Sequence, residues 1–141
     1  MNTILQFQNT VPDIFSSLAN IHKLIDSYGI DRKLSHLIML RASQINQCRY
    51  CIELHANEAR EDGVSSERID CVNVFKHMDC FEEKEKLALE WTEVLTYLRS
   101  ETNYNEIRNK LLKILNEKEI FALTSLIGMI NLWNRIRISE H

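Results

Sequence analysis

Residues 117–138 of the chain are EKEIFALTSLIGMINLWNRIRI. Across 120–133 the apolar side chains would occupy nearly every side of a helix and leave almost no polar stripe. A helix that is apolar all round must be covered all round. We therefore expect this segment to be either the central helix of a monomeric bundle or a helix with one face covered by a second subunit. Of the two, we favour self-association.

The rest of the chain also predicts helices. Three glycines and one proline are too few for a protein built from many short strands, which needs turn residues in quantity. Asp31 and Asn103 are suited to cap helices at their N-termini, and Gly29 to follow a helix end. An apolar i, i+3, i+4, i+7 pattern runs through residues 87–98. The sequence predicts one all-α domain over residues 1–141, with about seven helices at 13–28, 31–46, 47–63, 65–78, 79–98, 103–115 and 117–138.

Composition and charge exclude several classes of partner. The net charge is −3, and the lysines and arginines are scattered, so we expect no binding to nucleic acid or to an anionic membrane. The apolar run at 120–133 is shorter than the ~20 residues of a membrane-spanning helix. Residues 1–15 contain no basic segment followed by a long apolar run, so we expect no signal peptide and a cytoplasmic location. Cysteines there are normally reduced.

The candidate chemistry lies in Cys48-Arg49-Tyr50-Cys51, with His55 one helical turn further on. On a helix Cys48 and Cys51 are about 60° apart and Cys51 and His55 about 40°, so all three project from one face. We expect Cys48 in the first helical turn, where the helix dipole stabilises a thiolate. Two cysteines at this spacing can close a reversible disulfide, and His55 can accept and return a proton.

Other interpretations of the cysteine pair are a zinc site or two inert core residues. Zinc requires a fourth ligand beyond Cys48, Cys51 and His55, and none is nearby in the sequence. Cys71 and Cys80 lack the C-x-x-C spacing and are interpreted as small core residues. A covalent haem site would need histidine at position 52, which is isoleucine. We therefore favour a redox pair and expect no metal or other cofactor.

The stretch LRASQINQCRYCIELH at 40–55, followed by Ala59, Arg60 and Gly63, resembles alkylhydroperoxidase-D-like (AhpD-like) proteins of the carboxymuconolactone decarboxylase superfamily. LALEWTE at 87–93 and INLWNR at 130–135 extend the resemblance over nearly the whole chain from residue 12. It implies an AhpD-like helical bundle that assembles into dimers, trimers or hexamers and reduces hydroperoxides. Cys51 would be the peroxide-attacking thiol, Cys48 the more exposed resolving partner, and His55 the relay histidine. Electrons would come from a dithiol reductant, such as a dihydrolipoyl group on a lipoylated partner protein.

One position departs from the family pattern. The family relay usually includes a glutamate twelve residues before the first cysteine, and this position is His36. A histidine can carry a proton but cannot supply a fixed negative charge. His36 can reach the cysteines only if the chain bends back; otherwise it is a partly buried surface residue. Glu90 and Glu93 are the other candidates for the missing carboxylate, although a solvated helix face explains them better.

Two functions of other classes stay open at this point. A lactone decarboxylase, like the enzymes that name the superfamily, is favoured by fold analogy alone, and such enzymes do not need a cysteine pair. A non-enzymatic redox sensor would instead use Cys48 and Cys51 to change its oligomeric state. Asn131, Asn134 and Arg135, unexpectedly polar for the last helix, are predicted to hydrogen-bond between helices or subunits.

Overall fold

All the regular secondary structure is helical within residues 4–141, the part of the chain that the computed structural model describes. The all-α prediction is therefore confirmed. None of the helices in this range is both long enough and apolar enough to cross a bilayer. In chain order they are α1 (Phe7–Thr10), α2 (Pro12–Asp26), α3 (Arg32–Ile45), α4 (Arg49–Glu61), α5 (Ser66–Asp70), the 3-10 helix η1 (Val72–His77), α6 (Glu83–Tyr97), α7 (Tyr104–Leu112) and α8 (Glu117–Ser139).

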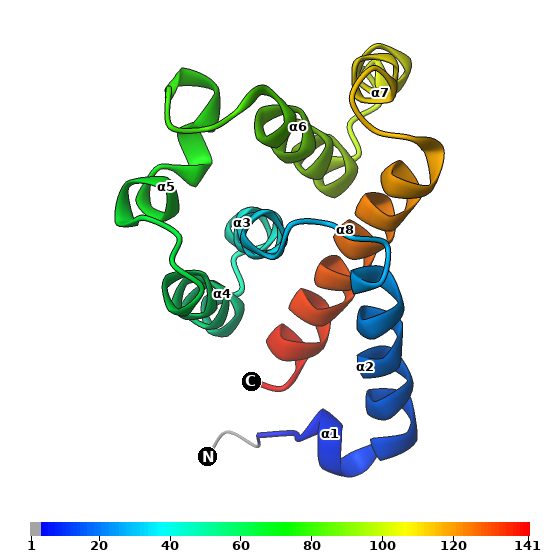
Figure 1. Ribbon diagram of the computed structural model, residues 1–141. Helices are drawn as coiled ribbons and strands as arrows, with labels where there is room; N and C mark the ends of the chain where they lie inside the picture. The colour runs from blue at the N-terminus through cyan, green and yellow to red at the C-terminus, as the bar shows by residue number, and fades with distance from the viewer. Residues whose placement is uncertain (1–3) are drawn as a thin grey trace.

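The central helix of the bundle is α3, which packs against α4, α6 and α8 (Figure 1). Its Leu37 and Ile38 are fully buried, and burial extends to its polar Ser35, His36 and Ser43. A polar side chain in such a position needs a partner. The central helix of this fold therefore also carries buried polar groups toward its neighbours.

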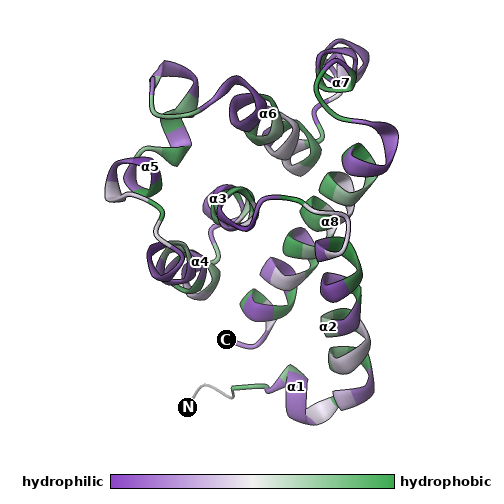
Figure 2. Ribbon diagram, viewed as in Figure 1, coloured by the Kyte–Doolittle hydropathy of each residue, from purple (hydrophilic) through white to green (hydrophobic). Residues whose placement is uncertain are grey.

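The long apolar helix α8 packs against α2, α3 and α6 (Figure 1). Hydrophobic residues line much of its length (Figure 2), and Leu126, Ile127 and Ile130 are each 1% exposed. Phe121, however, is 70% exposed. The single chain thus covers only part of α8, and the face of Phe121 is one for which the sequence predicts cover from a second subunit.

Helix boundaries follow the predicted caps in most places. The side chain of Asp31 accepts from Lys33 N and that of Asn103 from Glu106 N. Gly29, just past α2, has a φ of +83°, a conformation that costs glycine little. Asn116, which was not predicted, caps α8.

Two predicted helices have wrong boundaries, and one helix of the structure was not predicted. The segment 65–78 is not a single helix, because α5 ends at Asp70 and η1 follows with a non-helical Val74. The next helix does not open at Asp79 but at Glu83, where Glu82 and Glu85 form a capping box. The short α1 was not predicted. In these places local capping and tertiary packing override the apolar periodicity.

The two ends of the described chain meet beside α8. Leu5 N donates to the carbonyl of Glu140, and Phe7 N donates to its carboxylate at 2.9 Å. Phe7 and Phe15 pack edge-on against Trp133, with ring centroids 6.0 and 5.8 Å away. This contact fixes α2 against the C-terminal half of α8 and shapes the wall between them.

Candidate active site

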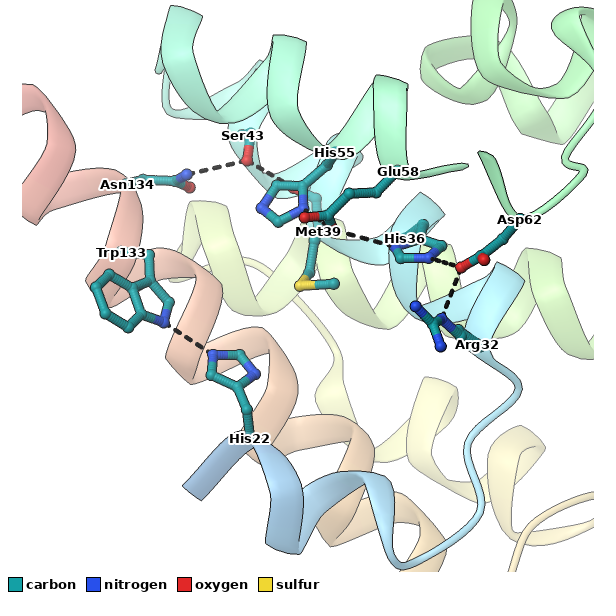
Figure 3. Close-up of polar contacts among 10 residues, drawn as sticks. All are labelled: His22, Arg32, His36, Met39, Ser43, His55, Glu58, Asp62, Trp133 and Asn134. Carbon is teal, nitrogen blue, oxygen red and sulfur yellow. Dashed lines mark hydrogen bonds and ion pairs between the residues drawn. The ribbon is translucent and has the colours of Figure 1, made fainter. Parts of the chain in front are cut away.

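The turn between α3 and α4 is held in place by α8. Gln47 has a φ of +57°, so the chain reverses there, and Cys48 N donates to Ser43 O at 3.1 Å. The Asn46 amide donates to the side chains of Asn131 and Asn134 at 2.8 and 2.9 Å. Asn134, which is fully buried, donates in turn to Ser43 Oγ at 2.9 Å (Figure 3). These bonds fix where α4, and with it the cysteine pair, begins.

The two asparagines confirm the inter-helix role predicted for them. Within the single chain Arg135 makes no inter-helix bond, because it is exposed and bonds only to Asn131 of its own helix. The prediction that Glu93 lies on a solvated face of α6 is wrong. That carboxylate is 17% exposed and pairs with Arg41 at 2.7 Å.

Cys48 and Cys51 are joined as a disulfide, with their Cα atoms 5.3 Å apart. Cys48 is the N-cap of α4, one position before the first turn where we expected it, and its sulfur accepts a bond from Cys51 N at 3.4 Å. Sulfur at this position meets the positive end of the helix dipole. Both residues are 2% exposed, so the expectation that Cys48 is the more exposed one is wrong for the single chain.

The two sulfur-bearing residues face different spaces. Cys51 and His55 line a pocket of about 350 Å³, whose other walls come from α2, α3 and α8. Its lining is mostly apolar and aromatic: Phe15, Ala19, Met39, Leu54 and Trp133. Cys48 lines a separate hollow of about 550 Å³ with Arg49, Glu53 and His141. Tyr50 and Arg137 border both spaces.

His36 does reach the site, because α3 and α4 pack against each other. One carboxylate oxygen of Glu58 lies 3.6 Å from Nδ1 of His36 and 3.6 Å from Nδ1 of His55 (Figure 3). At 3.6 Å each contact is an ion pair when the ring is protonated, and lies just beyond hydrogen-bonding distance. Glu58, which comes from α4, therefore places a carboxylate beside both imidazoles.

The other side of the His36 ring is bound to a second carboxylate. Its Nε2 lies 2.5 Å from Asp62 Oδ2, which Arg32 Nε approaches to 2.6 Å (Figure 3). His36 is 5% exposed, so its ring has one orientation available between two acidic groups. The polar chain runs from the pocket at His55 through Glu58, His36 and Asp62 to the exposed Arg32.

Both carboxylates have lowered pKa values. For Glu58 the neighbouring His55 lowers the pKa most, burial opposes it, and the charges of His36 and Arg32 add to the lowering. For Asp62 the hydrogen bond with His36 is the largest cause of the lowered pKa, again against burial and with help from Arg32. Both groups are thus ionised at neutral pH and keep two negative charges beside the imidazoles.

Glu58, Asp62 and His22 were not predicted from the sequence as site residues. The first two had a signal: Cys51, His55, Glu58 and Asp62 are spaced i, i+4, i+7 and i+11, which is one face of a helix. His22 had none, since it comes from α2 and reaches the pocket only through tertiary packing. Cys71 and Cys80 are half-buried and free. Within residues 4–141 no three His, Cys, Asp or Glu side chains are grouped to hold a metal ion.

A protein-family model and a known bacterial protein both match most of the chain. Residues 12–94, more than half of the chain, match the model of the carboxymuconolactone decarboxylase family. The chain belongs to this family. It is 30% identical over 139 residues to the uncharacterized protein YdfG of Bacillus subtilis (strain 168), covering 99% of this chain and 95% of that protein. The resemblance inferred from the motifs is thereby confirmed.

Two solved structures share the fold. ATU0492 of Agrobacterium tumefaciens is a protein of unknown function whose name assigns it to antioxidant defence (AhpD). It superposes with a TM-score of 0.90 at 29% identity. The match covers 99% of this chain and 95% of that one. The debrominase Bmp8 has a TM-score of 0.79 at 19% identity, over 94% of this chain and 72% of its own. The AhpD-like fold is therefore confirmed, and the same fold also carries a different chemistry.

Proposed function

We propose that this family member is a thiol-dependent antioxidant oxidoreductase that reduces organic hydroperoxides through Cys48 and Cys51. The observation that supports it most is the shared pocket: Cys51 and His55 line one apolar space, Cys48 is bonded to Cys51, and Glu58 stands beside His55. A nucleophile, a base and a group that orients the base are the parts that thiol catalysis requires.

The proposed reaction has two steps on the enzyme. The Cys51 thiolate attacks the terminal oxygen of the hydroperoxide, the O–O bond breaks, and the alkoxide takes the proton that His55 received from the thiol. Cys51 is then a sulfenic acid. The Cys48 thiolate attacks its sulfur, the S–S bond forms, and hydroxide leaves as water with the Cys48 proton. One hydroperoxide thus gives one alcohol, one water and one disulfide.

A dithiol reductant returns the two electrons by exchange with the disulfide. We propose that it acts at Cys48, because Cys48 opens to its own hollow, apart from the pocket of Cys51. A dihydrolipoyl group on a partner protein is of the right class, since one molecule carries both thiols. The hydroperoxide and the reductant would then use different entrances.

In this scheme Glu58 and His36 act through His55. The fixed charge of Glu58 stabilises the imidazolium that forms when His55 takes the Cys51 proton. His36 holds Glu58 from the other side and is itself held by Asp62. His36 is therefore proposed as a positioning residue, and its own imidazole is a second group that can exchange a proton.

Peroxide turnover tests the proposal. With cumene hydroperoxide and dihydrolipoamide, wild-type protein should consume peroxide, and Cys51→Ser should lower the rate to the uncatalysed background. Cys71→Ser, which removes a free and half-buried thiol elsewhere, should retain the wild-type rate. Unchanged turnover in Cys51→Ser would end the proposal.

We further propose that the chain self-associates through the surface that α2 and α8 form together. A groove of about 440 Å³ lies there between Ile21, Leu24, Tyr28 and Phe121. These side chains are 39–70% exposed, and a cluster of large exposed apolar residues marks an interaction site. A dimer, a trimer or a hexamer would remove this surface from water.

A further inference from the structure

The pocket also contains a histidine that the proposed reaction does not use. His22, on α2, lines the pocket together with Cys51. Its Nε2 lies 2.8 Å from the indole nitrogen of Trp133 on α8 (Figure 3), and the two ring planes are inclined by 25° with centroids 6.3 Å apart. Two helices thus hold this imidazole in a set orientation, as expected of a ring that has a specific task.

The Trp133 contact fixes which nitrogen of His22 carries the proton. An indole N–H can only donate a hydrogen bond. His22 Nε2 therefore accepts, and in the neutral ring the proton must reside on Nδ1. In water, neutral histidine favours the Nε2–H tautomer. The Nδ1–H form of His22 is therefore imposed by the protein. Among residues 4–141 no other hydrogen bond to this ring is formed, which leaves the Nδ1–H as its free donor.

The surroundings keep the ring neutral. Burial is the largest cause of a lowered His22 pKa, and the nearby His55 lowers it further. Asp26 and Glu58 act in the opposite direction without cancelling the shift. At neutral pH His22 is thus an uncharged donor, and an uncharged donor suits a neutral acceptor.

Two of the other polar residues around the pocket already face charged partners. Arg137 lies over the rings of Tyr50 and Trp133 at 5.3 and 5.4 Å and pairs with Glu140 at 2.8 Å. His55 faces Glu58. The remaining walls are apolar or aromatic, and Tyr50, which is 49% exposed, lies at the border with the hollow of Cys48. The ligand that this lining fits has an apolar body and an oxygen acceptor.

We propose that His22 is a specificity-determining residue: held in the Nδ1–H tautomer by Trp133, it donates a hydrogen bond to the carbon-bound oxygen of an organic hydroperoxide. This inference rests on the proposed function for the identity of the ligand. The same bond would form to the product alcohol, in which that oxygen is the hydroxyl. Hydrogen peroxide has no body to fill the apolar walls, so the pocket would select against it.

The tautomer is tested by nitrogen NMR of protein labelled at histidine. In wild type, His22 should show the protonated Nδ1 and unprotonated Nε2 pattern. Trp133→Phe keeps an aromatic wall but removes the donor, and His22 should shift toward the Nε2–H form that prevails in water. A protonated Nε2 on neutral His22 in the wild type would overturn the inference.

Binding is tested with two ligands of nearly equal shape, 2-phenylpropan-2-ol and tert-butylbenzene, of which only the first has an oxygen. The ratio of their Kd values should change by about fivefold to tenfold between wild type and His22→Phe, as expected for one hydrogen bond. His77→Phe, at an exposed histidine on η1, should leave the ratio unchanged. An unchanged ratio in His22→Phe would overturn the inference.

These measurements need no turnover. They can therefore fail while the Cys51 test succeeds, or succeed while the Cys51 test fails, so the two proposals are judged separately. Retention of the wild-type NMR dispersion shows that each variant is folded before its binding ratio is interpreted.

Discussion

At the scale of single residues, Glu58 connects the parts of the candidate site. One of its carboxylate oxygens lies 3.6 Å from ring nitrogens of both His36 and His55. It joins an imidazole of the central helix α3 to the imidazole that lies one turn after Cys51. Its lowered pKa means that the negative charge is present at neutral pH.

Replacing Glu58 with glutamine removes this charge and keeps the shape. We expect kcat/KM for cumene hydroperoxide to fall about tenfold to a hundredfold, less than the roughly 10²–10⁴-fold contributed by a group that transfers the proton itself. Glu58→Asp should recover part of the loss, because it restores a carboxylate. Glu61→Gln, at an exposed site on the same helix, is the control and should retain the wild-type value.

Asp62 has a pH-dependent effect on stability. A carboxylate whose pKa is lowered on folding stabilises the protein above its unfolded pKa of ~3.9 and loses that contribution as the pH falls through the folded pKa. Urea denaturation should therefore find Asp62→Asn less stable than wild type at pH 7, with the difference shrinking below about pH 4. Asp70→Asn, at an exposed position, is the control. A difference that is constant from pH 7 to pH 3 would contradict the assigned contact.

The sequence could predict part of this site and not the rest. Cys48, Cys51 and His55 lie on one helix, so their spacing alone brings them together. Glu58 and Asp62 share that spacing, but they are recognised as part of the site only through their contacts with His36, which belongs to another helix. The direction in which α3 packs on α4 depends on the whole core, so it cannot be predicted from residue spacing within one helix.

At the scale of elements, the turn between α3 and α4 determines where the cysteines lie. Asn134 is fully buried and bonds to both Asn46 and Ser43. The apolar pattern of the last helix predicted that its few polar residues would need partners, and for Asn131 and Asn134 this is confirmed. The failed boundaries at 70–83 are places where side-chain caps and a kink at Val74 decide the local structure.

Asn134→Leu should destabilise the fold. It removes the Asn46–Asn134 and Asn134–Ser43 hydrogen bonds, and the loss of two buried hydrogen bonds costs about 1–3 kcal/mol. Urea denaturation at pH 7 measures the loss. Arg135→Gln, on the exposed side of the same turn of α8, should change stability by no more than about 0.5 kcal/mol. Equal effects of the two substitutions would show that the Asn134 bonds hold nothing in place.

At the scale of the whole molecule, the exposed apolar surface of α2 and α8 is the feature that one chain leaves unexplained. The sequence indicated that α8 needs more cover than a small bundle provides, and the structure locates the uncovered part at Phe121. The sequence could not locate it, because which side of α8 faces α3 depends on how the helices pack.

Phe121→Asp places a charge on this surface and should reduce the assembly to a smaller species, as measured by light scattering after size-exclusion chromatography. The reason is that a charge buried without a partner at an interface costs more than the apolar contact contributes. Val74→Asp, on η1 and also exposed, should leave the assembly unchanged. A wild-type chain that is already monomeric at high concentration would refute self-association.

The most direct test of the account is a single turnover of the reduced protein. One equivalent of cumene hydroperoxide should convert Cys48 and Cys51 to a disulfide, seen by mass spectrometry as the loss of two hydrogens. In Cys48→Ser the same treatment should leave a sulfenic acid on Cys51 that dimedone traps. If the thiols of the wild type survive the peroxide, or if dimedone labels no residue in Cys48→Ser, the assignment of a redox site to this pair is wrong.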